Sequence, residues 1–202
     1  MRGKDALRAL FQAFEDRGAP IPLKDLLSSL VALDITRDDV AEAVRFDGAG
    51  YQRIIIHHGT HFEALVLCWQ SGQGSPIHDH AGSSCAVRIV EGRATETTYR
   101  RSPSGQLYPS QSRSYKQGSV TGCHDQGTHQ VANLQPAGQN LITLHVYSPP
   151  PSEWSYYRLD DTTLAGHDRV IENRPETLRV DLGHEPTPAP HVHAPARRGV
   201  KA

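Results

Sequence analysis

The sequence predicts an all-β fold, a closed barrel or jelly roll, with a small helical segment in front of it. Between residues 51 and 147 short segments with a period of two alternate with turns that contain glycine or proline, a pattern typical of strands in a β-barrel. Before residue 47 the apolar residues instead follow the spacing of an amphipathic helix. The chain has 202 residues, enough for one domain with a substantial core.

The helical segment, residues 1–47, contains three expected helices. In the first, over residues 4–17, an apolar stripe ends near Gly18, and the second covers residues 23–33. Thr36 and Asp39 resemble a capping box with a shortened acid, which would open the third helix. We expect these helices to cover an outer face of the barrel and to carry no chemistry.

The barrel is expected over residues 48–175. Its strands are expected at residues 51–56, 62–69, 85–90, 94–99, 114–120, around 129 and at 139–147. Residues 102–111 read as a polar loop, and residues 154–159 as a further strand. From His184 onward proline and alanine dominate, so residues 176–202 are expected to be a disordered C-terminal tail.

Composition excludes several classes of partner. The chain has 21 Lys and Arg against 22 Asp and Glu, a net charge of −1, which gives no electrostatic reason to expect binding to nucleic acid or membrane. No apolar run approaches the ~20 residues that span a bilayer, and no signal peptide is visible. Three widely spaced cysteines do not form a disulfide framework. The sequence therefore predicts a cytoplasmic protein.

A pair of histidines, His78 and His80, is the strongest functional signal. Glycines and a proline precede the pair, so the segment is extended, and side chains two apart on an extended chain point to the same side. An isolated pair of this kind is equally compatible with two surface histidines in a turn. A metal site needs a third nitrogen, which His129 or His124 could supply; His129 is favoured because Asn133 follows it at the spacing described next.

The spacing from Gly72 through His78, His80 and Cys85 to Gly92 is that of the first cupin motif. His129 and Asn133 retain part of the second motif. Cys85 stands where most cupins have a glutamate ligand. Three imidazoles without that carboxylate form a neutral ligand set, which suits a non-haem iron with open positions.

Four segments together resemble the cysteine dioxygenase family, the thiol dioxygenases of the cupin superfamily. They are Cys68–His80, Cys85–Gly92, His129–Asn133 and Leu144–Pro150, and the resemblance extends over residues 51–150. It implies a cupin barrel and an Fe(II) enzyme of cysteine catabolism that oxidises L-cysteine with O2 to cysteine sulfinic acid. Its partners would then be a small-molecule thiol and O2.

The resemblance also implies roles for individual residues. His78, His80 and His129 would hold the iron. Arg53 would bind the substrate carboxylate, for which a planar guanidinium is well suited, and Tyr51 would line the pocket beside it. A cis peptide bond is implied between Ser148 and Pro149.

Residues 142–147 form the other informative strand. Thr143, His145 and Tyr147 share one face and apolar residues the other. Alternation alone favours a polar face turned to solvent. The resemblance favours an inward face instead, on which Tyr147 contacts substrate or oxygen while His145 and Thr143 orient its phenol from behind.

Cys85 raises a further expectation. In animal cysteine dioxygenases the cysteine and tyrosine that match Cys85 and Tyr147 form a thioether crosslink, whereas many bacterial relatives have glycine at the first position. The pair in this chain permits the bond, and the alternative is an ordinary small buried residue. Cys68 is expected in the core and Cys123 in a loop.

Two other functions are compatible with parts of the sequence. Relatives that oxidise 3-mercaptopropionate resemble each other in having glutamine where Arg53 stands and in lacking Cys85, so this chain favours cysteine. A non-catalytic cupin that binds a small anion is the third hypothesis. His57, His58 and His61 are interpreted as turn residues rather than metal ligands.

Overall fold

The computed structural model describes residues 3–80, 82–124, 127–152, 154–159 and 177–179. Three helices come first: α1 (Gly3–Asp16), α2 (Leu23–Ala32) and the short 3-10 helix η1 (Asp38–Ala43). The strands that follow are β1 (Gln52–His58), β2 (Glu63–Trp69), β3 (Ile77–Asp79), β4 (Ser84–Glu91), β5 (Arg93–Arg101), β6 (Leu107–Lys116), β7 (Val120–Cys123), β8 (His129–Ala132), β9 (Leu141–Ser148), β10 (Ser155–Tyr157) and β11 (Thr177–Arg179).

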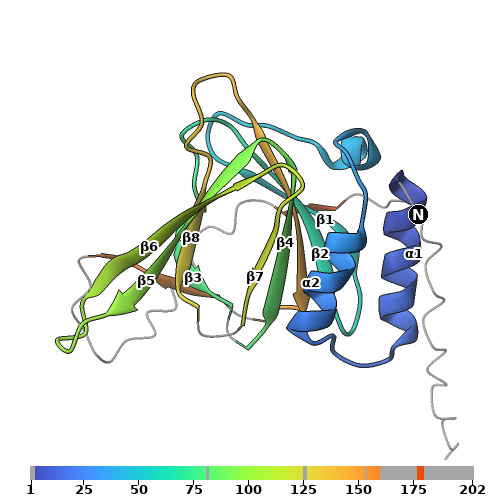
Figure 1. Cartoon of the computed structure of the whole chain (residues 1–202), viewed down its shortest axis with the longest axis horizontal. Coiled ribbons are helices and arrows are strands. Elements are labelled where there is room, and N and C mark those ends of the chain that lie inside the picture. The colour runs from blue at the N-terminus through green and yellow to red at the C-terminus, as the bar shows by residue number, and fades with distance from the viewer. Residues whose placement is uncertain (1–2, 81, 125–126, 153, 160–176, 180–202) are drawn as a thin grey trace, which may run out of the picture.

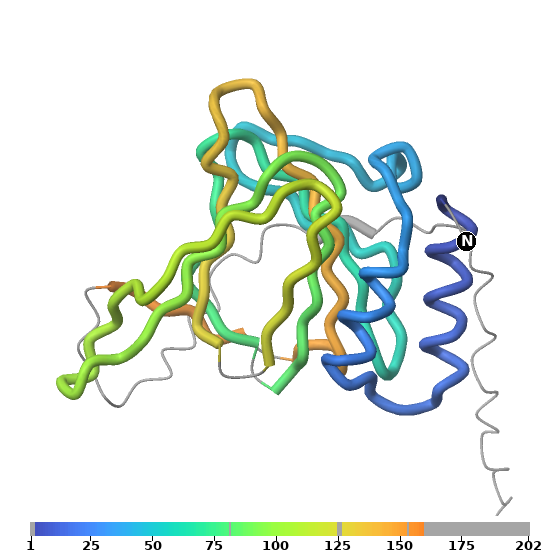
Figure 2. Tube along the Cα trace, in the orientation of Figure 1, coloured from blue at the N-terminus to red at the C-terminus, as the bar shows by residue number. Residues whose placement is uncertain are grey.

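The strands form two sheets that face each other (Figures 1 and 2). One has the order β11-β1-β2-β9-β4-β7 and the other the order β10-β3-β8-β5-β6. Among the described strands every pairing is antiparallel except that of β1 with β11. The predicted all-β cupin barrel with a small N-terminal helical segment is confirmed.

The helices cover the outer face of the six-stranded sheet, as Figure 1 shows. One apolar core lies between them, to which α1 and α2 contribute Leu7, Phe11 and Leu30 and the sheet contributes Ile54 and Val66. Each of these side chains stabilises the fold by about 1.5–3 kcal/mol when fully buried. The helices thus give the outer face of the sheet a hydrophobic partner.

Strand β9 lies in the middle of that sheet, between β2 and β4, and all its residues are buried. Its apolar residues Ile142, Leu144 and Val146 belong to the core under the helices. Tyr147 belongs instead to a second apolar cluster, inside the barrel. The apolar face of β9 packs against the helices, and its polar face therefore points into the barrel.

Several elements differ from those expected. Residues 107–111, placed in a polar loop, begin strand β6, which pairs with β5 along its whole length. Thr97 and Ser112 hydrogen-bond across this pair at 2.8 Å. Hydroxyls on two exposed strands form such bonds without an apolar face, so β6 shows no hydrophobic alternation to detect.

The helix expected at residue 36 and the expected C-terminal tail flank the barrel region. The expected helix at residue 36 is the 3-10 helix η1, and both the backbone N–H and the hydroxyl of Thr36 donate to the Asp39 carboxylate, at 2.8 and 2.9 Å. Strand β11 lies within the segment 176–202, and the rest of that expected disordered tail lies outside the described residues. The domain boundaries stay predictions. No helix in the described ranges is long and apolar enough to cross a membrane.

Candidate metal centre and pocket

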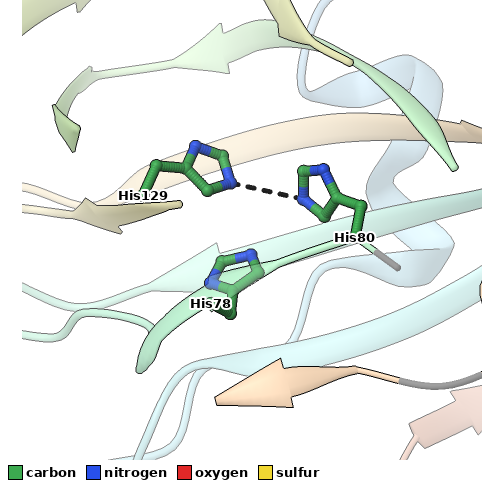
Figure 3. A group of neighbouring side chains, drawn as sticks. All are labelled: His78, His80 and His129. Carbon is green, nitrogen blue, oxygen red and sulfur yellow. Dashed lines mark hydrogen bonds between the residues drawn. The ribbon is translucent and has the colours of Figure 1, made fainter. Parts of the chain in front are cut away.

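The three predicted ligands lie together. His78 is on β3 and pairs in register with His129 on β8, while His80 directly follows β3. Each imidazole offers one ring nitrogen as a possible ligand, and these three nitrogens lie within 4.8 Å of one another. Figure 3 shows the Nε2 atoms of His80 and His129 pointing toward each other, 3.2 Å apart, with His78 beside them. His124, the rival ligand, is exposed between β7 and β8 and is not part of this group.

Each imidazole is held from behind through its Nδ1 atom. The partner of His78 is the carbonyl oxygen of Pro76 at 2.9 Å, and that of His129 is a carboxylate oxygen of Glu96 at 2.7 Å. Both oxygens only accept, so both Nδ1 atoms donate and both Nε2 atoms keep a lone pair for a metal. The Nδ1 atom of His80 lies 3.3 Å from the thiol sulfur of Cys123.

Burial keeps two of these imidazoles, His78 and His80, neutral. Burial, reinforced by His129 and His80, lowers the pKa of His78 well below its ordinary value. Burial and the same His129 lower the pKa of His80 to about 3. Neutral imidazoles are ligands for iron, zinc, copper or nickel. The buried group therefore fits a divalent transition metal, held by three nitrogens with further positions open.

Glu96 brings a negative charge behind this neutral set. Burial opposes its ionisation, but the hydrogen bond from His129 lowers the pKa of Glu96 overall. The hydroxyl of Thr121 also donates to it, at 3.4 Å. An ionised carboxylate that accepts from a ligating histidine fixes the ring and makes it a stronger donor to the metal.

A row of hydrogen bonds runs along the inner face of β9 and orients Tyr147. The indole N–H of Trp69 donates to the Thr143 hydroxyl at 3.1 Å, and Thr143 Oγ1 lies 3.0 Å from His145 Nε2. His145 Nδ1 in turn lies 3.2 Å from the Tyr147 hydroxyl. Burial lowers the pKa of His145 and raises that of Tyr147, so both side chains are neutral at neutral pH.

Cys85 occupies the middle of a row across three strands. Tyr147 is its register partner on β9 and Cys123 its register partner on β7. Opposite residues of an antiparallel pair share a face, so all three side chains point into the barrel. Cys85 is 1% exposed, and burial and the neighbouring Cys123 raise the pKa of its thiol.

Arg53 and Tyr51 approach the histidines from β1 and the residue before it. The Tyr51 ring stacks on Trp69 with centroids 4.2 Å apart, and its hydroxyl bonds the guanidinium of Arg53. Among the described residues no carboxylate forms an ion pair with Arg53. A partly buried cation without a counterion is a natural anchor for an anionic ligand.

One pocket collects these groups. Its lining includes Tyr51, Arg53, Trp69, His78, His80, His129, His145, Tyr147 and Trp154. Cys85 and Thr143 lie directly behind this lining, and both contact His145. All the predicted site residues are therefore brought together, although their roles stay predictions.

The other histidines and Cys68 have structural partners. His57 and His58 were expected in a turn, but they end β1 because they pair with β2. His57 stacks on Phe62 and lies 2.6 Å from a carboxylate oxygen of Glu15. Cys68 is in the core, as expected.

Three residues of the site were not predicted from the sequence: Glu96, Cys123 and Trp154. Glu96 is the one acidic residue among the threonines of β5, a signal that could have been noticed. Cys123 was expected in a loop but ends β7, opposite Cys85. Trp154 follows the cis bond between Ser148 and Pro149, which the resemblance implied and which is present.

Comparisons with known proteins agree with this geometry. The sequence model of the family described as "Cysteine dioxygenase type I" matches residues 9–159. Cysteine dioxygenase type 1 of Bos taurus is 29% identical over 150 residues, which cover 72% of this chain and 74% of the relative. That of Danio rerio is 28% identical over 153 residues, covering 73% and 74%.

Among solved structures, a conserved protein of Klebsiella pneumoniae with a double-stranded β-helix domain is similar at a TM-score of 0.47. It shares 18% identity with this chain and covers 59% of it and 94% of its own length. The match of the family model extends over most of the chain and includes all three clustered histidines. The chain belongs to the cysteine dioxygenase type I family.

Proposed function

We propose that this protein is an iron(II)-dependent thiol dioxygenase that oxidises L-cysteine to cysteine sulfinic acid in the cytoplasm. The thiol gains both atoms of one O2 molecule, so that RSH and O2 give RSO2H with no other reactant. The observation that carries the proposal is one pocket with three clustered, buried imidazoles and a guanidinium that has no described carboxylate partner.

His78, His80 and His129 would hold the iron. Bound there, iron(II) would supply coordination sites for thiol and oxygen and would lower the pKa of the thiol. The Pro76 carbonyl, the Glu96 carboxylate and the Cys123 thiol would keep the three rings in the ligating orientation. Burial lowers the pKa values of His78 and His80, so these two rings are unprotonated and free to bind a metal.

Arg53 would hold the substrate carboxylate. Its guanidinium lines the same pocket as the histidines, and Tyr51 bonds it from the side. A substrate anchored at one end by its carboxylate brings its thiol to a fixed place, which converts an encounter of separate molecules into a reaction of positioned groups. A charge-assisted bond of this kind also rejects thiols that lack the carboxylate.

Tyr147 would contact the bound substrate or oxygen through its hydroxyl. Its phenol is buried and neutral, so it keeps a proton to donate. His145 and Thr143 would hold the ring in place, and Trp69 would hold Thr143. In this account Tyr147 touches the reacting groups and the other three act by positioning it.

A second candidate is the same oxidation of 3-mercaptopropionate, which lacks the amine. Arg53 and Cys85 support cysteine as the substrate, because relatives that oxidise 3-mercaptopropionate resemble each other in having neither residue. The third candidate, a cupin that binds a small anion without catalysis, predicts no oxygen consumption with any thiol.

An oxygen electrode combined with product analysis separates the three. Iron-loaded protein should consume O2 with L-cysteine and yield the sulfinate in equal amount, with a higher kcat/KM than for 3-mercaptopropionate. A reversed order would assign the second substrate. If protein shown to contain iron consumes no oxygen with either thiol, only the third candidate, anion binding without catalysis, would remain.

A further inference from the structure

Trp154 lies against both ends of the proposed substrate site. Its ring centroid is 4.8 Å from the guanidinium carbon of Arg53. The same ring lies 5.5 Å from that of His78, 5.6 Å from that of His80 and 5.3 Å from that of Tyr147. One indole thus contacts the cation, two of the three clustered imidazoles and the phenol.

The position of Trp154 follows from the strand after it. Strand β10 pairs with β3, and Ser155 is opposite Asp79. Trp154 is one residue further, next to the end of β3 from which His80 projects. Strand β10 belongs to the five-stranded sheet and Arg53 to the six-stranded sheet, so the contact between Trp154 and Arg53 joins the two sheets across the pocket.

The room left in the pocket is small. The cavity among its lining side chains has a volume of about 20 Å³, and one water molecule needs roughly 10–15 Å³ on the same measure. Leu67, Trp69 and Val131 on its walls are buried in the sheets, where packing resists displacement. Trp154 is only half-buried, and it directly precedes β10, a short strand that pairs with β3 at three residues.

We propose that Trp154 determines the length of thiol that the pocket accepts, by occupying the space between Arg53 and the histidine cluster. This rests on the proposed function, in which the carboxylate binds at Arg53 and the thiol at the histidines. Cysteine must push the indole aside only slightly, whereas each added methylene between carboxylate and thiol demands more of the space that the indole fills. The guanidinium also loses its aromatic neighbour when the indole moves further.

The pocket would accept short thiols with a carboxylate and reject their longer homologues. One added methylene in a closely fitting pocket changes kcat/KM by about 10–200-fold. Homocysteine carries one methylene more than cysteine between thiol and carboxylate. The parent should therefore favour cysteine over homocysteine by at least about tenfold.

The test compares cysteine with homocysteine in the iron-loaded parent and in Trp154→Ala, Trp154→Leu and Trp154→Phe. Trp154→Ala should lower the preference for cysteine, measured as the ratio of the two kcat/KM values, by about tenfold or more. The smaller ring of Trp154→Phe should lower it less. Tyr108→Ala removes an exposed aromatic ring on β6, 45% exposed, and should leave the ratio unchanged.

Binding measured without oxygen keeps the inference testable apart from catalysis. Calorimetric titration should show that the parent binds cysteine more tightly than homocysteine and that Trp154→Ala binds the two with similar affinity. An unchanged preference in folded Trp154→Ala or Trp154→Leu, in either assay, would overturn the role of Trp154. Selective binding that Trp154→Ala abolishes, without oxidation of any thiol, would overturn the proposed function and leave the role of Trp154 intact.

Discussion

Cys85 and Tyr147 are register partners on the adjacent strands β4 and β9, and both side chains point into the barrel beside the three clustered histidines. The Cys85 thiol sulfur and the Tyr147 hydroxyl both approach the same atom, His145 Nδ1, at 4.0 and 3.2 Å. A thioether between them needs no change of fold. It needs only the loss of two hydrogens, one from the thiol and one from the phenol ring, which O2 can accept.

Repeated turnover with cysteine should therefore join Cys85 to Tyr147. Peptide mapping should find the two peptides linked, with a mass two hydrogens below their sum, and resistant to reduction. Cys85→Ser should keep its iron and part of its turnover, because the bond restricts the phenol without creating it. If Cys85 stays fully alkylatable in active, iron-loaded protein, it is a packing residue.

Glu96 should strengthen metal binding. Replacing a carboxylate that accepts from a ligating histidine lowers metal affinity by about 10–100-fold, and we expect this for Glu96→Gln in a chelator competition assay with Fe(II) or Zn(II). Glu91→Gln is a matched control, because Glu91 pairs with Arg37 at 3.2 Å, away from the pocket. Equal metal affinity in Glu96→Gln and the parent would remove Glu96 from the centre.

Much of the fold and the site could be predicted from the sequence because their signals are local. The spacing of His78 and His80 and the alternation on residues 142–147 are each contained in one strand. Glu96 stands out in the sequence as an acid among threonines, but its role and that of Cys123 could not be assigned, because these roles come from the pairing of β5 with β8 and of β7 with β4. Pairing between strands far apart in the sequence leaves no periodic pattern.

The direction of the polar face of β9 shows the same limit. Alternation gives two faces but does not say which is inside. That choice depends on α1 and α2, which bury Ile142, Leu144 and Val146 from the other side. The first part of strand β6, residues 107–111, was missed for a different reason: it is largely exposed, so its side chains carry no hydrophobic pattern.

Arg53→Gln should weaken the use of cysteine. Loss of a charge-assisted bond to the carboxylate costs roughly 1.5–3 kcal/mol, or about a tenfold to hundredfold fall in kcat/KM. The fall should be smaller for 3-mercaptopropionate, since relatives that use it resemble each other in having glutamine here. Steady-state kinetics with both thiols measures the ratio, and an unchanged ratio would show that Arg53 does not set the preference.

The stability of the metal-free protein should fall as the pH is lowered. The unfolded chain binds a proton at His80 near the ordinary pKa of 6.5, whereas the folded protein does so only near about 3. Stability is thus fully present above pH 6.5 and declines from there down to about pH 3, by about 2 kcal/mol at pH 5 for this one residue.

Urea unfolding with a chelator present, at pH 7 and at pH 5, measures this decline. His80→Asn removes the titrating group, so its free energy of unfolding should fall by about 2 kcal/mol less than that of the parent between pH 7 and pH 5. His124→Asn, the same change at an exposed histidine between β7 and β8, controls for the effect of the substitution itself. The same loss in His80→Asn and the parent would contradict a buried neutral His80.

The three clustered histidines should support dioxygenation of a thiol. Iron-loaded parent protein is given L-cysteine under ¹⁸O2, and the sulfinate is analysed by mass spectrometry, alongside His129→Ala and His124→Ala. We predict a product with two labelled oxygen atoms from the parent and from His124→Ala, and neither iron nor product in His129→Ala. A product without label, a product with one labelled atom, or full activity in His129→Ala would contradict the claim.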